Sequence, residues 1–287
     1  MTIREIDDLI KFGDSLKVVA QAYGEIASIK IKKIRTQVEK NRLFFREIAD
    51  VYRIVKLYAS QRGLITIKHK QTLSILITSN QGFYGGIDTQ VIGFFLDNIV
   101  KFPSDKIVIG KTGREYLKEI GFNAPFQSVE FKDDLPNPQE LISLTQIIGE
   151  YKQALVFYPQ LATALVQKPA VEDITQSFLS QTQNLLQMAA QNQKTELDYF
   201  IFEPELIKIL SFFDNQILNL LLQQTFLEAE VARTASRLLA MDQAQREADN
   251  FISDQKKVRS HILKDKINNR LLEIFSYISS LRKEATL

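Results

Sequence analysis

The sequence predicts an α/β protein in which two long terminal helices flank a folded insert. Proline is absent before Pro103 and after Pro204, and glycine is absent after Gly149, so residues that break helices are confined to the first and middle parts. Both ends carry apolar residues at intervals of three and four. Because the insert returns the chain to where it left, the two helices can pair antiparallel, and we expect a long antiparallel coiled coil with an inserted α/β domain.

The N-terminal helix is predicted over residues 1–62. Its apolar residues form one stripe that is interrupted in the middle, and a stripe of this kind needs a partner helix to bury it. We therefore expect the stripe to pack against the C-terminal helix. Its members are Leu9, Phe12, Leu16, Val19, Tyr23 and Ile26, followed by Phe44, Ile48, Val51, Val55 and Tyr58.

The middle of the chain, residues 72–195, is predicted to form the α/β domain. Apolar runs of strand length occupy residues 73–78, 106–109 and 154–158. Segments of helical character lie between them, at residues 90–100, 114–120 and 139–151. Because strand and helix alternate, we expect a largely parallel sheet covered by helices.

The C-terminal helix is predicted over residues 205–287 and pairs with residues 1–62. A continuous helix of this length at ~1.5 Å per residue reaches on the order of 120 Å, which no compact domain of this size contains. Near its end, apolar residues alternate spacings of four and three, as in a coiled-coil seam. They are Ile267, Leu271, Ile274, Ile278 and Leu281.

Composition excludes several classes of function. The chain has 287 residues and a formal net charge of +2, which is too near balance to indicate nucleic acid as a partner. No run approaches the roughly 18 to 20 apolar residues that span a bilayer, and the N-terminus lacks the apolar core of a signal peptide. We therefore expect a protein that stays on the side of the membrane where it was made and meets the membrane through partners only.

Few residues are available for catalysis or metal binding. The chain has no cysteine and only two histidines, His69 and His261, which lie far apart in the sequence. No Ser/His/Asp, Cys/His or paired-carboxylate arrangement stands out. We expect no active site, no metal site and no cofactor.

Two glycine-containing turns resemble nucleotide-binding loops in part. Gly110-Lys111-Thr112 matches the end of a phosphate loop, but the glycine that such a loop needs five positions earlier is Asp105, whose carboxylate would repel phosphate. Gly82, Gly85 and Gly86 follow a strand, but their spacing differs from Gly-x-Gly-x-x-Gly. Tight strand-to-helix turns are the favoured interpretation of both segments.

Basic residues interrupt both terminal helices, and we call them the basic collar. Such runs are usually solvated helix surface. The alternative is a positive band on the paired helices that meets carboxylates of a surrounding partner. The members are Lys30, Lys32, Lys33 and Arg35 in the first helix, and Lys256, Lys257, Arg259, Lys264 and Lys266 in the last.

Five segments, in order along the whole chain, resemble the gamma subunit of F-type ATP synthases. The family's Ser-Asp-Arg/Lys-Gly-Leu-Cys-Gly-Gly-Phe/Tyr-Asn aligns with residues 79–88, where Ser79, Gly82, Gly85 and Gly86 are in register. Its Ala-Met-x-Met-Val-Ala-Ala-x-Lys-Leu/Met-Arg-Arg/Lys segment is similar to residues 22–33, which end in Lys32 and Lys33. The remaining matches are residues 237–241 with Arg-Met-x-Ala-Met, residues 271–274 with the Glu-Leu-x-Glu-Ile-Val ending, and residues 199–204 with Tyr-Glu-Pro.

The resemblance implies a coiled coil that enters a ring of three alpha and three beta subunits, with a Rossmann-like α/β domain at its foot. It implies that the foot meets the membrane-embedded c-ring, with an epsilon subunit beside it, and that the basic collar faces acidic loops of the beta subunits. Residues implied to meet the hexamer are Lys30, Lys32, Lys33, Arg237, Met241, Lys264, Lys266, Ile267, Leu271, Glu273 and Ile274. Those implied to meet the ring are Phe202 and Glu203, and those that form the structural turn are Ser79, Gly82, Gly85 and Gly86.

Several positions depart from the family pattern. The family's Arg-Gln-Ala-x-Ile-Thr falls on residues 263–268, where the arginine, glutamine and threonine are replaced, and Arg233 stands where the family has glutamate. The family's small-residue ending, Gly-Ala-x-Ala-Leu, falls on residues 277–281, which read Tyr-Ile-Ser-Ser-Leu. These changes indicate a divergent member or a paralogue. The absence of a presequence favours a bacterial protein at the cytoplasmic side of the cell membrane.

The function expected from the resemblance is that of a rotor shaft, which couples ion-driven rotation of the membrane ring to ATP synthesis or hydrolysis. Three alternatives remain. The first is a gamma-like shaft in a related ATPase used for hydrolysis-driven work. The second is a coiled-coil scaffold that binds one partner through a helix face. The third is a nucleotide-dependent enzyme that uses the turn at Gly110.

Overall fold

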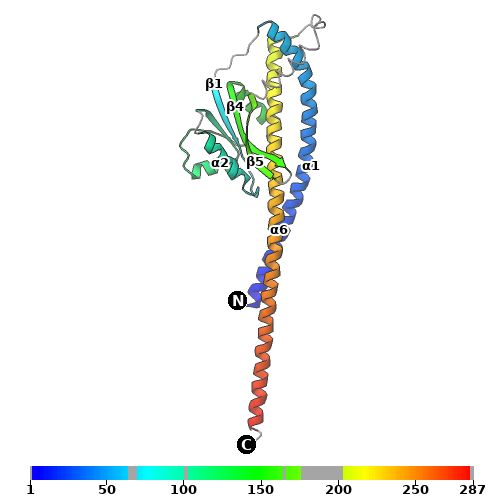
Figure 1. The fold of residues 1–287 in the computed structure, drawn as a ribbon, viewed down its shortest axis with the longest axis vertical. Coiled ribbons are helices and arrows are strands. Elements are labelled where there is room, and N and C mark those ends of the chain that lie inside the picture. The colour runs from blue at the N-terminus through cyan, green and yellow to red at the C-terminus, as the bar shows by residue number, and fades with distance from the viewer. Residues whose placement is uncertain (1, 64–69, 100–102, 164–165, 176–202, 285–287) are drawn as a thin grey trace. The chain divides into compact units, whose positions relative to one another are not determined.

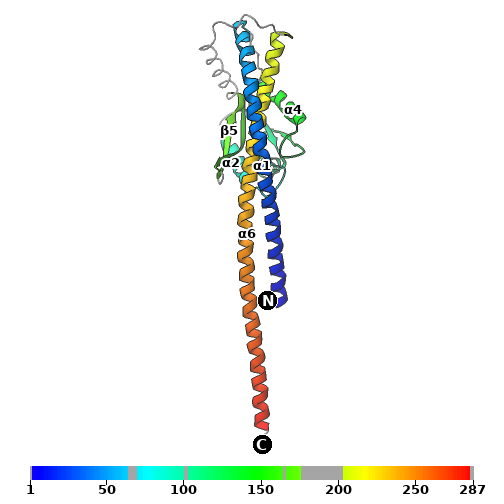
Figure 2. The ribbon, with the colours of Figure 1, turned by 90° about the vertical axis from the view of Figure 1, so that its right-hand side faces the viewer.

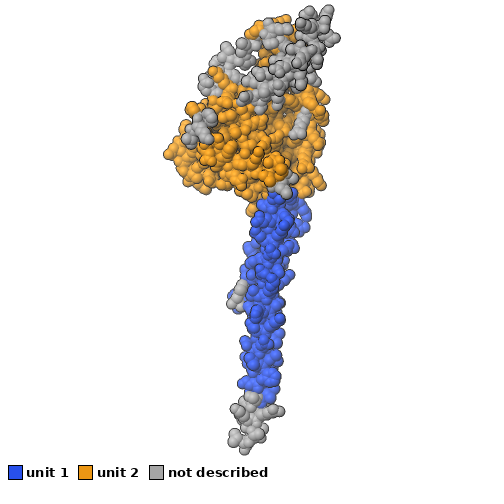
Figure 3. Space-filling model, in the orientation of Figure 1, with its two compact units in different colours: residues 1–26, 238–287 blue, residues 27–237 orange. Residues whose placement is uncertain are grey.

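The computed structural model describes residues 2–63, 70–99, 103–163, 166–175 and 203–284. A long helix at each end, α1 (Ile3–Gln61) and α6 (Leu206–Glu284), flanks a five-stranded sheet with its covering helices (Figure 1). The chain divides into two compact units, which Figure 3 colours separately. Unit 1 comprises residues 1–26 and 238–287, and unit 2 comprises residues 27–237. The division of the chain into 1–62, 72–195 and 205–287 stays a prediction.

The sheet of unit 2 is largely parallel, in the order β3-β2-β1-β4-β5. Strand β1 pairs parallel with both β2 and β4, and β2 pairs parallel with β3. Only the pairing of β4 with β5 is antiparallel. The strands are β1 (Lys70–Ile77), β2 (Asp105–Ile109), β3 (Gln127–Val129), β4 (Tyr151–Thr163) and β5 (Val166–Asp173).

Helices cover both faces of this sheet. Because side chains alternate along a strand, Ile75 and Leu76 of β1 enter different cores. Ile75 packs in a core with α4 (Pro138–Gly149) and with residues of α6 such as Phe226. Leu76 packs in a core with α2 (Ile87–Ile99) and α3 (Lys111–Glu119). Figure 2 shows α2 and α4 on opposite sides of the sheet.

The two long helices also pack on each other within unit 2. Tyr52 and Val55 of α1 share a buried cluster with Leu210 of α6. Nearer the sheet, Ile34 packs against Leu227 and Val231. The pairing is antiparallel, as predicted, because residues later in α1 meet residues earlier in α6. One polar side chain sits in this seam. Asn41 is buried, and its amide donates to the Leu220 carbonyl at 3.3 Å.

In unit 1 the seam between the two helices includes a glycine and an alanine. Ile6, Gly13 and Ala20 of α1 are buried at a spacing of seven, which is the period of a coiled coil. A Cβ on Gly13 would lie 2.7 Å from Cγ1 of Ile252, so the helices approach closely there. Ion pairs flank the seam, Lys17 with Asp249 at 2.7 Å and Arg259 with Asp7 at 2.6 Å. Their order makes the pairing antiparallel here as well.

This seam corrects the predicted apolar stripe. Phe12, Leu16, Val19 and Ile26 are each about half exposed and are not buried as the stripe predicted. The physical reason is that glycine and alanine allow a close approach of the two backbones, which the larger side chains would prevent. In unit 2 the same stripe is buried only in part, since Val55 is buried whereas Phe44 and Val51 are about half exposed.

The structure also extends the predicted sheet. The three predicted strands overlap β1, β2 and β4, and the three predicted helices overlap α2, α3 and α4. Two strands were not predicted, β3 with three residues and β5 with the antiparallel pairing. Among the described residues, no helix combines the length and apolar character needed to cross a membrane.

Candidate partner-binding surfaces

The end of α6 exposes a run of large apolar side chains. Every described side chain from 264 to 278 is exposed. We call the apolar members the C-terminal apolar surface, and they are between 48% and 66% exposed. Contiguous exposed apolar residues of this kind mark a protein-binding surface. They are Ile267, Leu271, Leu272, Ile274, Phe275, Tyr277 and Ile278.

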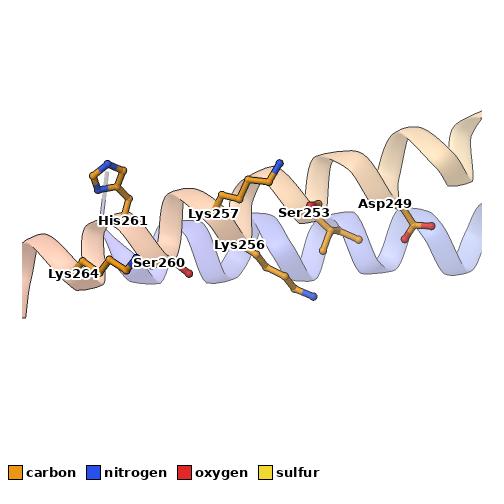
Figure 4. Close-up of a pocket in the computed structure, with 8 residues that line it drawn as sticks. Asp249, Ser253, Lys256, Lys257, Ser260, His261 and Lys264 are labelled. Atoms are coloured by element: carbon orange, nitrogen blue, oxygen red, sulfur yellow. The ribbon is translucent and has the colours of Figure 1, made fainter.

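Basic residues of the collar lie just before this surface. Lys256, Lys257, His261 and Lys264 line a surface groove of α6, shown in Figure 4. Lys257 pairs with Asp254 at 2.8 Å, and His261 lies 3.5 Å from Asp265. Lys266 and Glu273 line the next groove along the helix. The exposed ammonium groups can meet carboxylates of a partner.

The basic residues of α1 behave differently from one another. Lys32 and Lys33 are exposed. Lys30 is partly buried, and its ammonium forms an ion pair with Glu230 of α6. The charge of Lys30 is thus already matched within unit 2, whereas Lys32 and Lys33 remain available to a partner.

Arg237 and Met241 lie near the middle of α6, one in each unit. Arg237 is buried, and its Nη2 donates to the Gly82 carbonyl at 2.8 Å. Its guanidinium also lies 3.9 Å from the centre of the Tyr84 ring, a cation–π contact. Met241 is partly buried in unit 1, where its Cβ faces Gly24 of α1. Both side chains therefore make contacts inside their own unit.

The predicted structural turn follows β1 and leads into α2. Gly85 and Gly86 have φ of 60° and 78°, a backbone region that favours glycine, and Phe83 between Gly82 and Tyr84 has φ of 66°. Ser79 anchors the turn, because its hydroxyl donates to the Gln81 carbonyl at 2.9 Å and to the Asp88 carboxylate. Gly82 presents its carbonyl to Arg237.

The second turn, at Gly110-Lys111-Thr112, is hydrogen-bonded to the first turn. The N–H groups at the start of α3 already have acceptors within the protein. Lys111 donates to Asn80 Oδ1, Thr112 to the Ser79 carbonyl and Gly113 to Thr78 Oγ1, each at 3.0 Å. A phosphate at this helix start would have to displace them, which argues against the nucleotide-binding alternative.

A cluster of buried charges joins the first turn to α6, and we call it the buried charge network. Arg233 and Glu230 are fully buried, and Arg233 Nη2 lies 2.8 Å from Glu230 Oε2. Two further carboxylates are buried nearby, Asp88 at the start of α2 and Asp134 in the loop before α4. With Lys30, the members are Lys30, Asp88, Asp134, Glu230 and Arg233.

The environment of the network shifts several pKa values. Burial raises the pKa of Asp88, although the Arg233 charge and the Ser79 hydroxyl favour its ionised form. Burial opposes the charged form of Arg233, but Glu230, Asp88 and Asp134 together raise its pKa, so it stays protonated. Burial, followed by the negative charges of Glu230 and Asp134, raises the pKa of Tyr84, which stays a hydrogen-bond donor.

Sequence reasoning missed this network. It noted Arg233 only as a departure from the family pattern. The signal was present, because Glu230 and Arg233 stand three residues apart in an otherwise apolar and small-residue stretch of α6, a spacing at which helical side chains meet. The carboxylates that complete the cluster come from distant segments, and only the fold brings them there.

The segment assigned to the foot is described in part. Glu203 is exposed and precedes α6, whereas Phe202 lies outside the described residues. Among the described residues, no group of three or more histidine, cysteine, aspartate or glutamate side chains is arranged to hold a metal ion.

Comparison with known proteins covers nearly the whole chain. A family model described as ATP synthase matches residues 2–281. The chain is 23% identical over 294 residues to the ATP synthase gamma chain of Staphylococcus epidermidis, with 98% of this chain and 99% of that protein covered. It is 25% identical over 296 residues to the gamma chain of Alkaliphilus metalliredigens, with 98% and 99% covered.

Solved structures share the fold. A chain of the central stalk and c-ring of the Tetrahymena thermophila mitochondrial ATP synthase is 19% identical, with a TM-score of 0.57 over 79% of this chain and 99% of that one. A chain of the Euglena gracilis mitochondrial ATP synthase is 17% identical, with a TM-score of 0.56 over 91% and 97%. Together with the match over residues 2–281, these likenesses show that the chain belongs to the ATP synthase family and is a homologue of ATP synthase gamma chains.

Proposed function

We propose that this chain is the central-stalk rotor subunit, the gamma subunit, of an F-type ATP synthase. In this role it couples ion-driven rotation of a membrane ring to ATP synthesis or hydrolysis in an alpha/beta hexamer. The observation that carries the proposal is the C-terminal apolar surface, in a chain that matches the ATP synthase family over residues 2–281. Seven large apolar side chains exposed within 12 residues of one helix need a partner that covers them.

The hexamer is the partner that we assign to unit 1. The C-terminal apolar surface, with Ile267, Leu271 and Ile274, would turn as an apolar bearing inside it. Lys264, Lys266 and Glu273 add charges beside that bearing, and we assign Lys32 and Lys33 of unit 2 to the same partner. Exposed ion pairs contribute only about 0.2–1 kcal/mol each, so they bias a rotational position more than they hold the complex together.

The remaining partners are assigned from the family resemblance. We place the exposed Glu203, and Phe202 beside it, against the c-ring, with an epsilon subunit next to the α/β domain. In this assignment residues 1–62 and 205–287 are the shaft and residues 72–195 are the foot. The protein then lies at the cytoplasmic side of a bacterial cell membrane and meets the membrane through its partners.

Affinity purification of the tagged chain from its own host tests this function. We expect alpha, beta and epsilon subunits and the c-ring to be recovered with it, together with ATPase activity. Alpha and beta subunits without a ring would instead support the hydrolytic relative. A chain that recovers neither would leave the coiled-coil scaffold as the better interpretation and would refute the rotor.

A further inference from the structure

The buried charge network places its central cation where water cannot reach it. Arg233 has no exposed side-chain surface, and its Nε and Nη2 lie 3.2 and 2.8 Å from Glu230 Oε2. Removing a charge from water is costly unless partners compensate it. The position of Arg233 is therefore tied to the positions of the groups that surround it.

Besides α6 itself, those groups come from two other segments of unit 2. From α1, Lys30 pairs with Oε1 of Glu230, whereas Arg233 pairs with Oε2 of the same carboxylate. From the loop before α4, the Asp134 carbonyl accepts from Arg233 Nη2 at 3.5 Å. The Asp134 carboxylate in turn accepts from the Asn80 N–H and the Tyr84 hydroxyl, both at 2.6 Å. The guanidinium thus connects α6 to the turn after β1 through one intermediate residue.

Neighbouring residues of α6 hold the same turn directly. The Ser236 hydroxyl donates to the Tyr84 carbonyl at 2.7 Å. Arg237 donates to the Gly82 carbonyl and lies over the Tyr84 ring. At the other end of the turn, Ser79 bonds to Asp88, the buried carboxylate at the start of α2. One stretch of α6 therefore holds both the turn and the helix that follows it.

We propose that Arg233 is a positioning residue that fixes the α/β domain to α6, so that the domain and the two helices of unit 2 move as one body under torque. The inference rests on the proposed rotor function. A set of buried charges of both signs suits this task, because sliding one element past another would separate a buried charge from its partners. Apolar contacts alone resist such sliding less, since they have no fixed direction.

The test uses the ATP synthase complex that contains this chain, in inverted membrane vesicles. Arg233→Met removes the charge and keeps much of the volume. We expect ATP hydrolysis to persist while ATP-driven ion pumping per ATP hydrolysed falls to a small fraction of the wild-type value. Arg246→Met is the matched control, because Arg246 lies on the same helix in an exposed ion pair with Asp242. It should pump as the wild type does.

A second variant separates positioning from folding. The triple change Asp88→Asn, Glu230→Gln and Arg233→Met removes the buried cation together with two of the carboxylates near it, so that neither of these is left as an unpaired buried charge. Asp134 keeps its charge and the hydrogen bonds that it accepts from the Asn80 N–H and the Tyr84 hydroxyl. Lys30 keeps its charge, since it is partly exposed and can turn to solvent. We expect this variant to assemble and hydrolyse ATP, with reduced pumping per ATP and faster amide hydrogen exchange in residues 79–88.

The outcomes are distinct. Wild-type pumping and wild-type exchange in the triple variant would overturn the proposal and leave the network a purely structural feature. Normal pumping in Arg233→Met would overturn it as well. Failure of the rotor function itself would look different, because the wild-type complex would then show no ATP-driven pumping at all.

Discussion

At the scale of single residues, the space beside a glycine decides how the two helices meet in unit 1. A Cβ on Gly13 would lie 2.7 Å from Ile252 Cγ1 and 3.2 Å from Phe251 Cδ1. Gly93 of α2 has nothing within 4 Å of the same position. A side chain at position 13 would therefore clash with the partner helix, whereas position 93 has room for one.

The first prediction compares alanine at these two positions. Gly93→Ala should raise the free energy of unfolding by up to about 1 kcal/mol, since alanine is the better helix former. Gly13→Ala should lower it by about 1 kcal/mol, because the cost of overpacking exceeds that gain. Urea denaturation of the full chain measures both. Equal stabilisation by the two changes would contradict the close seam.

The second prediction concerns the buried carboxyl of Asp88. Its pKa in the folded chain is raised above the ordinary value of 3.8 by burial. The folded state therefore binds the Asp88 proton more tightly than the unfolded state does. As a result, the contribution of Asp88 to the free energy of unfolding falls as the pH rises above 3.8. Asp88→Asn cannot ionise and should gain stability relative to the wild type over that range.

Urea denaturation from pH 4 to pH 7 checks the sign of this effect. The difference between Asp88→Asn and the wild type should grow in favour of the variant as the pH rises. If the wild type instead gained stability relative to the variant, the attraction of the Arg233 charge for the Asp88 carboxylate would outweigh burial. Asp242→Asn is the control, because this exposed residue should show no comparable trend.

Residue-scale features were predictable where the chemistry is local. Gly85 and Gly86 have positive φ, which glycine adopts most readily, so the presence of glycine there is a local signal. The seam of unit 1 was not predictable from hydrophobicity, because Gly13 and Ala20 contribute through their small size. The carboxylates that act on Arg233 lie up to 145 residues away in the sequence, at Asp88, so no local sequence pattern predicts them.

At the scale of elements, the strands that were predicted and those that were missed differ in a physical way. The strands found at 73–78, 106–109 and 154–158 are apolar because helices cover both faces of the parallel part. Strand β5 carries Pro169, which usually argues against a strand. The structure places β5 at the edge of the sheet, where a missing N–H is tolerated, and β3 at the other edge is too short for a pattern.

The third prediction tests the C-terminal apolar surface. Leu271→Ser with Ile274→Ser removes two exposed side chains, so the stability of the chain itself should not change. Capture of the alpha/beta hexamer should weaken on the order of a hundredfold if both side chains are buried by the partner. Ile120→Ser with Ile142→Ser is the matched control, because these side chains are similarly exposed on the α/β domain.

Binding titrations with purified hexamer measure this effect, and thermal unfolding of each variant shows whether the chain is intact. An unchanged affinity for Leu271→Ser with Ile274→Ser would remove this surface from the hexamer interface. A loss of affinity in the control pair would place the interface on the α/β domain instead.

The fourth prediction tests the continuity of α6. Ala240 lies within the helix, in unit 1. Ala240→Pro should cost about 3 kcal/mol or more and kink the helix, because proline removes a hydrogen bond and clashes with the preceding turn. Coupling of ATP hydrolysis to ion pumping should be abolished. Ala240→Ser, which keeps the helix, serves as the control, and normal pumping by the proline variant would refute a stiff shaft.

At the scale of the whole molecule, two long helices flank one α/β domain in the sequence, and the second helix exposes apolar side chains over residues 267–278. The order of elements could be predicted, because proline and glycine are placed where helices must end. The surfaces that meet partners follow from exposure, which only the folded chain reveals. In the proposed function the chain works through its stiffness and its surfaces.

Observation of rotation tests the central claim most directly. The chain has no cysteine, so Lys118→Cys on α3 gives one attachment point for a visible probe. The alpha/beta hexamer from the same host would be immobilised with this chain bound and supplied with ATP. The account predicts unidirectional, ATP-dependent rotation of the probe. A hexamer that hydrolyses ATP at its normal rate while the probe on the bound chain stays still would contradict it.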